Sequence, residues 1–185
     1  MKKWVLLCAA ALLFAGGASA QDFPRAEVFG GYSFAHLGAD GSSANFNGGS
    51  ASVAYNLFPW LGVVGDFGGY HGDSSFGNGN LYSYLFGPKV ALRHGPITPF
   101  VQALFGGAHA TASVSCDTAR VKPQGTVECG SIGENSFAMT VGGGLDWNAT
   151  PHIGVRLIQA EYFMTNFANT RENGARISAG VVFRF

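Results

Sequence analysis

The feature that most constrains this fold is a period of two in the apolar residues, repeated along most of the chain. Eight segments alternate apolar residues with small or polar ones, and turn-forming residues separate them. These segments are residues 25–36, 47–58, 61–71, 80–93, 99–112, 136–147, 152–164 and 175–185. The 28 glycines and 16 phenylalanines also disfavour helices. The sequence therefore predicts an all-β fold of eight antiparallel strands.

Residues 1–20 have the composition of a secretory signal peptide. Lys2 and Lys3 precede an apolar run, and Ala18-Ser19-Ala20 provides a small-residue cleavage pattern. We therefore expect residues 1–20 to be removed and residues 21–185 to form a single domain. That domain has 9 basic and 11 acidic residues, which is not the basic footprint of a nucleic-acid-binding protein.

The connections between the eight segments alternate in length. Three are tight and contain proline, at residues 59–60, 94–99 and 148–152. The other four are longer and rich in Gly, Ser and Asn: residues 37–46, 72–79, 114–135 and 165–174. Short turns at one end and long loops at the other are typical of an up-and-down transmembrane β-barrel.

A soluble, ligand-binding barrel would give the same alternation with its apolar face turned inward. The membrane barrel is favoured because the polar face is rich in Gly and Ala, which suits a crowded lumen. Aromatic residues also gather near strand ends, as an interfacial girdle requires. They are Tyr32, Phe34, Phe58, Trp60, Tyr82, Trp147 and Phe163.

The last segment ends on an aromatic residue in mid-alternation, with Ile177, Val181, Phe183 and Phe185 on one parity. It resembles the C-terminal strand of bacterial outer-membrane β-barrel proteins. The stretches EVFGGYSFAHL (27–37), GPKVALRHGPITPFVQALFGGA (87–108) and GVRLIQAEYFMT (154–165) are also similar to the small OmpA-like barrel domain.

This resemblance implies a place in the bacterial outer membrane, in contact with its lipid and lipopolysaccharide. It further implies that periplasmic chaperones and the barrel assembly machinery are partners, and that Phe183 and Phe185 form the assembly signal. We expect no periplasmic peptidoglycan-binding domain, because no residues follow Phe185.

Charged residues on the polar parity are expected to pair inside the barrel, because buried charges must be paired. They are Glu27, Asp66, Lys89, Asp146, Arg156, Arg176 and Arg184. We expect Asp66 opposite Lys89, Glu27 near Arg184 where the first and last strands close the barrel, and Asp146 beside Arg156 across a tight turn.

Glu161 departs from the parity of Arg156 in the same segment. Either a bulge near Ile158-Gln159 re-aims the strand, or Glu161 lies above the hydrocarbon band. The second alternative is favoured.

The 114–135 loop is the main feature beyond the scaffold. Cys116 and Cys129 are the two cysteines that remain after cleavage, and in an exported chain we expect a disulfide between them rather than two free thiols. The loop either binds an extracellular ligand or only protects the surface.

No catalytic, cofactor-binding or metal-binding residues are expected, and the chain is not expected to be an enzyme. His36, His71 and His109 share the apolar parity on strands that are not neighbours, so they suit the headgroup level better than a triad or metal site. The expected role is structural or surface-interactive, including membrane integrity and adhesion. The alternatives are a narrow low-conductance channel and, more distantly, an outer-membrane enzyme.

Overall fold

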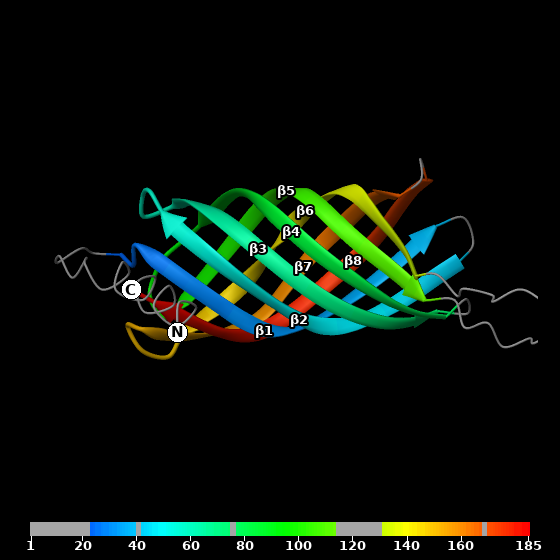
Figure 1. Cartoon of the computed structure of the whole chain (residues 1–185). Coiled ribbons are helices and arrows are strands. Elements are labelled where there is room, and N and C mark those ends of the chain that lie inside the picture. Colours follow the sequence, from blue (N-terminus) through cyan, green and yellow to red (C-terminus); the bar gives the residue numbers. More distant parts are fainter. Residues whose placement is uncertain (1–22, 40–41, 75–76, 114–130, 168–169) are drawn as a thin grey trace, which may run out of the picture.

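The computed structural model describes residues 23–39, 42–74, 77–113, 131–167 and 170–185, which form one closed antiparallel barrel (Figure 1). Each strand is hydrogen-bonded to the next in sequence, and β8 is bonded to β1. The strands are β1 (Ala26–Ala39), β2 (Ser42–Asn56), β3 (Leu61–Ser74), β4 (Gly77–Ala91), β5 (Ile97–Ser113), β6 (Ser131–Asn148), β7 (Ile153–Phe167) and β8 (Thr170–Arg184). The predicted eight-stranded up-and-down barrel is therefore confirmed.

No helix in the described part of the chain is long and apolar enough to cross a membrane.

The two ends of the barrel differ in their connections. At the turn end, residues 57–60, 92–96 and 149–152 join the strands. Gly95 adopts a φ of 69°, which only glycine adopts readily, and so makes one of these turns. The opposite end, here called the loop end, includes the 114–130 connection between β5 and β6.

At the loop end the strands extend further than predicted. β1 and β2 reach Ala39 and Ser42, although residues 37–46 were predicted to be a loop. β3 and β4 likewise extend through most of residues 72–79. Gly, Ser and Asn are typical of turns, but they also pair as strands where a neighbouring strand offers its backbone. Composition alone therefore overestimated all four loops, the 114–135 loop by the five residues that begin β6.

The strands are strongly staggered. Following hydrogen-bonded partners once round the barrel from Val28 leads back to Gly38, ten residues further along β1. Such a stagger tilts the strands by about 40° against the barrel axis. Residues at one height therefore come from very different positions in their strands.

Alternate side chains point outward and inward, as the sequence predicts. In β2, Val53 and Tyr55 are exposed on the outer surface while Ser52 and Asn56 are buried in the lumen. The exposed outer residues form an apolar band around the barrel, which includes Val63, Phe67, Phe86, Val101, Phe105, Val141, Ile177 and Val181.

A β-bulge in β7 breaks this alternation. In the pairing with β8 the register shifts between Arg156 and Gln159, and Leu157 and Ile158 both face outward. Gln159 and Glu161 consequently point into the lumen on the parity opposite to Arg156. The expectation that Glu161 lies above the hydrocarbon band is therefore wrong, and the bulge alternative is right. The same shift buries Phe163 in the lumen, although it was predicted in the outer girdle.

Candidate functional site

The lumen is the first candidate site, because it gathers charged side chains from all parts of the sequence. Four carboxylates and four cations are buried among the described residues. They are Glu27, Asp66, Asp146 and Glu161, with Lys89, Arg156, Arg176 and Arg184. The seven residues predicted as lumen charges therefore all lie inside the barrel, together with Glu161.

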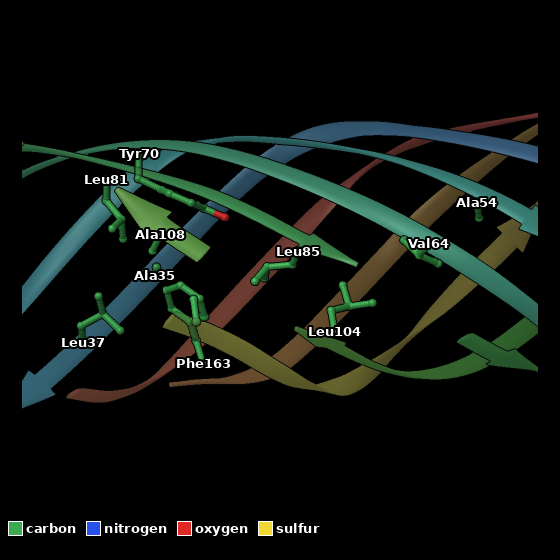
Figure 2. Packing of buried hydrophobic residues seen from close by; sticks show 11 residues of the cluster. Ala35, Leu37, Ala54, Val64, Tyr70, Leu81, Leu85, Leu104, Ala108 and Phe163 are labelled. Atoms are coloured by element: carbon green, nitrogen blue, oxygen red, sulfur yellow. The ribbon is translucent and has the colours of Figure 1, made fainter. Parts of the chain in front are cut away.

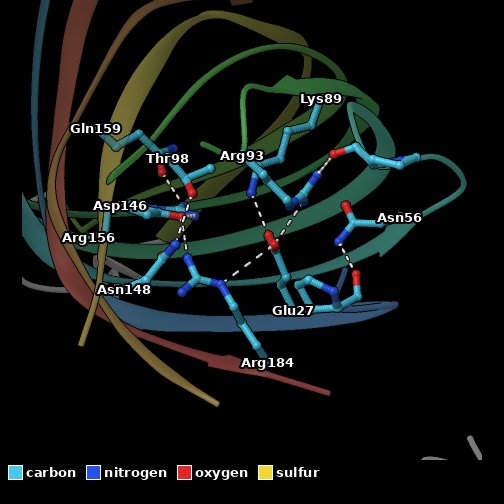
Figure 3. Close-up of polar contacts among 12 residues, drawn as sticks. Glu27, Asn56, Lys89, Arg93, Thr98, Asp146, Asn148, Arg156, Gln159 and Arg184 are labelled. Carbon is cyan, nitrogen blue, oxygen red and sulfur yellow. Dashed lines mark hydrogen bonds and ion pairs between the residues drawn. The ribbon is translucent and has the colours of Figure 1, made fainter. Parts of the chain in front are cut away.

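Glu27 is the centre of the charge cluster nearest the turn end (Figure 3). Its Oε2 accepts a hydrogen bond from Lys89 Nζ at 2.7 Å, and its Oε1 accepts one from Arg93 Nη2 at 2.9 Å. Arg184 Nε lies further away, 3.8 Å from Glu27 Oε1. Arg93 also donates to the backbone carbonyl of Pro59, so this cluster holds a turn against the barrel wall.

The predicted pairing of Asp66 with Lys89 is wrong. Asp66 is opposite Leu85 in the β3–β4 register, and Lys89 is opposite Gly62. The two side chains are thus separated by four residues along the strands, or roughly 13 Å. Barrel curvature and strand tilt bring Lys89 to Glu27 on β1 instead.

Asp146 and Arg156 form a two-bond pair across the β6–β7 turn (Figure 3). Arg156 Nε and Nη2 donate to the two carboxylate oxygens at 2.8 and 3.2 Å. The guanidinium also lies between two phenyl rings, 4.3 Å from the centroid of Phe29 and 4.4 Å from that of Phe100. Arg184 Nη2 approaches the same carboxylate at 3.5 Å, which links this pair to the Glu27 cluster.

Arg176 is the centre of a second cluster, further toward the loop end. Its guanidinium is fully buried and binds Asp66 at 2.6 Å through Nη1. It binds Glu161, its direct neighbour across the β7–β8 pair, at 2.7 Å through Nε and at 2.5 Å through Nη2. Tyr70 Oη at 3.1 Å and Gln102, which donates to Glu161 at 2.8 Å, complete the shell.

Gln159 connects the two halves of the network. Its Oε1 accepts from Arg156 Nη1 at 2.6 Å, and its Nε2 donates to Glu161 at 2.9 Å. Buried polar contacts therefore run without interruption from Asp146 to Arg176. The sequence offered no clear signal for Gln159, because its inward position depends on the bulge.

An apolar cluster fills much of the lumen toward the loop end, although two of its members, Ala54 and Val64, line the turn-end gap beside Glu27 and Lys89 (Figure 2). Its members are Ala35, Leu37, Ala54, Val64, Tyr70, Leu81, Leu85, Leu104, Ala108, Ala138 and Phe163, and Phe46 and Ala110 pack against it. Most of them come from the loop-end halves of their strands. Sequence reasoning expected a polar lumen throughout. The sequence did contain a signal for these inward apolar residues. Residues 81–86 are apolar or aromatic except for Ser83, and such a run is typical of a strand covered on both faces.

The gap between the charged side chains of the turn-end lumen is too small for a solute. The gap lined by Glu27, Phe29, Lys89, Gln102 and Arg156 has no volume that a water molecule enters. No group of three or more His, Cys, Asp or Glu residues with metal-binding geometry occurs in the described ranges. This interior is thus a packed polar network with an apolar cap.

The remaining predicted residues lie elsewhere. His36, His71 and His109 are on the outer surface, at the loop end of the apolar band. Phe183 and Phe185 are exposed on the same outer face at the turn end, and the backbone of Phe185 is hydrogen-bonded to that of Ala26 at 2.9 and 3.1 Å. Cys116 and Cys129 lie outside the described residues.

Comparisons with known proteins agree with this geometry. A family model described as "Outer membrane protein beta-barrel domain" matches residues 6–185. Neisserial surface protein A is similar in structure, with a TM-score of 0.66 and 17% identity over 89% of this chain and 100% of that chain. Ail, the attachment invasion locus protein of Yersinia pestis, has a TM-score of 0.59 and 20% identity over 87% of this chain and 99% of that one.

The N-terminal β-barrel domain of Pseudomonas aeruginosa OprF has a TM-score of 0.50 and 17% identity, covering 89% of this chain and 100% of that chain. At these identities the likeness concerns the fold. A search of curated proteins gave no match.

Proposed function

Because the chain belongs to the outer membrane protein beta-barrel family and so to the bacterial outer membrane, we propose that it is a closed, non-conducting barrel that presents the β5–β6 connection at the cell surface. The observation that carries this proposal is the filled lumen. Ion pairs occupy the turn-end half, and the apolar cluster occupies much of the loop-end half.

A conducting pathway would need a continuous hydrated channel through this interior. Opening one would require separating Arg176 from Asp66 and Glu161, which lie within 2.5–2.7 Å of it. Leaving a buried charge unpaired costs several kcal/mol, about 3–5 in measured cases. The narrow channel therefore remains the weaker alternative.

The proposed surface role rests on the β5–β6 connection, residues 114–130, which is longer than the other connections. It contains Arg120 and Lys122, and we propose that a Cys116–Cys129 disulfide closes it in the oxidising periplasm. Connections on a rigid scaffold commonly carry binding function. One structure of the similar Ail protein is a complex with the heparin analogue sucrose octasulfate, which supports a search for extracellular ligands here.

We further propose that export depends on a signal peptide at residues 1–20, and assembly on periplasmic chaperones and the barrel assembly machinery reading Phe183 and Phe185. The mature barrel, residues 21–185, then contacts outer-membrane lipid and lipopolysaccharide through its apolar band. No enzymatic role is proposed, since His36, His71 and His109 lie on the outer side of non-adjacent strands, each paired with its own asparagine.

Planar-bilayer recording of the refolded mature chain tests the closed lumen. We expect no steady single-channel openings. A matched variant, Arg176→Ala with Glu161→Ala and Asp66→Ala, removes three side chains from the middle of the lumen but leaves the turn-end ion pairs and the apolar cluster in place, so it should also show no steady openings. Steady openings of the unmodified protein, at the same protein-to-lipid ratio, would overturn the closed-barrel proposal.

A second comparison tests the surface role. A variant in which residues 116–129 are replaced by a short Gly/Ser turn should refold and remain closed but lose binding to host cells or extracellular glycans. The Cys116→Ser/Cys129→Ser variant separates loop closure from loop sequence. Equal binding by all three proteins would assign the connection a protective role only.

A further inference from the structure

The outer surface carries one polar pairing three times, on alternate strand pairs. In each case a histidine Nδ1 meets the Oδ1 of the asparagine across the strand pair. The pairs are His36–Asn45 between β1 and β2 at 2.6 Å, His71–Asn80 between β3 and β4 at 2.9 Å, and His109–Asn135 between β5 and β6 at 2.9 Å. We call these six residues the His–Asn belt.

The pairing fixes which hydrogen-bonding groups remain available. A carboxamide oxygen only accepts, so the ring Nδ1 must donate its hydrogen to it. The neutral ring then presents Nε2 as an acceptor, and the asparagine keeps both N–H donors of its Nδ2. In the third pair the His109 Nε2 lies 3.3 Å from the Thr111 hydroxyl. Each pair therefore places two amide donors next to a ring nitrogen on the outer face.

The belt lies at the loop-end edge of the apolar band. In the strand register His71 is opposite Asn47, two residues from Asn45, and His109 is opposite Tyr82, two residues from Asn80. Immediately toward the turn end, the outward side chains include Tyr32 and Tyr82, both more than half exposed. Tyr32 Oη donates to Asn47 Oδ1 at 2.5 Å, and Asn47 is the cross-strand neighbour of His71.

No Lys, Arg, Asp or Glu faces outward at this edge among the residues whose side chains are described. Among the described side chains, the polar groups that lipid headgroups meet on this part of the wall are therefore neutral donors and acceptors. A free anion in water would gain little from a few neutral amides. A lipid is different, because its acyl chains already lie on the apolar band and hold its headgroup at the belt.

We propose that the His–Asn belt binds phosphorylated glycolipid headgroups in the leaflet at the loop end, an inference that rests on the outward orientation of that end proposed above. The asparagine Nδ2 groups donate to phosphate oxygens. The Nε2 of His36 and that of His71 accept from a hydroxyl or amide N–H of the same headgroup, whereas the Nε2 of His109 already has the Thr111 hydroxyl as its partner. A phosphorylated amino-sugar lipid offers both groups side by side, and the belt matches that combination.

The test measures how much lipid A stays bound to the refolded mature barrel in neutral detergent, by native mass spectrometry. In the Asn45→Asp/Asn80→Asp/Asn135→Asp variant each donor becomes an acceptor of nearly equal size. Losing one or two hydrogen bonds per headgroup should weaken retention by about ten-fold. The matched control is Val63→Ile/Val101→Ile/Val141→Ile in the middle of the apolar band, which should retain lipid A as the unmodified protein does.

Dephosphorylated lipid A should be retained about ten-fold less than lipid A, and excess inorganic phosphate should not displace the lipid. Equal retention by the aspartate variant, equal retention of the dephosphorylated lipid, or displacement by inorganic phosphate would each overturn the proposal. Far-UV circular dichroism checks that the barrel is folded. If the aspartate variant does not refold, the corresponding leucine variant takes its place. These substitutions leave the lumen and residues 114–130 unchanged. The outcome of the lipid A test is therefore independent of the outcomes of the closed-barrel and surface-binding tests.

Discussion

Replacing Arg176 by leucine removes the cation that two carboxylates share in the middle of the lumen. Asp66 and Glu161 are both buried, and both hold Arg176 at 2.5–2.7 Å. Leucine fills part of the space but leaves the two carboxylates without a cation, and Glu161 keeps only its hydrogen bonds from neutral groups such as Gln102 and Gln159. Removing one member of a buried ion pair costs about 3–5 kcal/mol, and here two carboxylates lose their cation together. We therefore expect the free energy of unfolding to fall by at least about 3 kcal/mol.

The loss in free energy of unfolding comes from the two buried carboxylates that no longer have a cation. Replacing these carboxylates by neutral amides should recover much of that free energy. In Arg176→Leu/Asp66→Asn/Glu161→Gln the same positions carry no formal charge, and Gln102 can still hydrogen-bond to residue 161. Hydrogen bonds lost without stranded charge cost about 1 kcal/mol each. The triple variant should thus be more stable than the single one, although it carries more substitutions. If the destabilisation came only from lost packing, the triple variant would be less stable than the single variant.

The assay is urea-induced unfolding from lipid vesicles, followed by tryptophan fluorescence. Trp60 and Trp147 are the tryptophans that follow residue 20, and both are exposed on the outer wall at the turn end. Their emission reports whether the wall is in contact with lipid, and linear extrapolation gives the free energy of unfolding. An Arg176→Leu protein within about 1 kcal/mol of the unmodified one, or a triple variant no more stable than the single, would refute the reasoning.

Two further substitutions test other parts of the barrel by the same assay. Arg156→Lys keeps the charge but loses the two-bond pairing with Asp146 and the stacking on two phenyl rings, and should lower the free energy of unfolding by about 1–2 kcal/mol. At the β1–β8 closure, Gly31→Ala would push a methyl group into the carbonyl oxygen of Ala179 and should cost about 1–3 kcal/mol, whereas Gly30→Ala meets nothing within 4 Å and should change stability by less than about 1 kcal/mol.

The strands and their two faces were predictable because alternation is a local property. Every inward charge except Glu161 follows from the parity of its own strand. Pairing is not local in the same way. Lys89 meets Glu27, 62 positions away in sequence, because the stagger of the whole barrel sets which residues share a height. An error of a few residues at the centre of one hairpin is enough to choose the wrong partner.

The apolar cap of the lumen was missed for a different reason. Leu81, Leu85 and Leu104 lie inside, while Tyr82, Tyr84 and Phe105 lie outside, so both faces of these strands are apolar near the loop end. Alternation gives no contrast in such a stretch. Because the lumen was expected to be polar, these leucines were not predicted to lie inside it.

The bulge in β7 and the charge network at Arg176 depend on each other. Arg156, on the turn-end side of the bulge, and Glu161, on the loop-end side, both reach the lumen only because Leu157 and Ile158 face outward in succession. Without the extra residue Glu161 would point into the apolar band, where an unpaired carboxylate is strongly disfavoured. Arg176 would then retain Asp66 but lose the partner directly across the strand pair. The two consecutive apolar residues at 157–158 are therefore the sequence feature that marks the bulge. The bulge brings Glu161 inside, so that four buried carboxylates face four buried cations in the lumen.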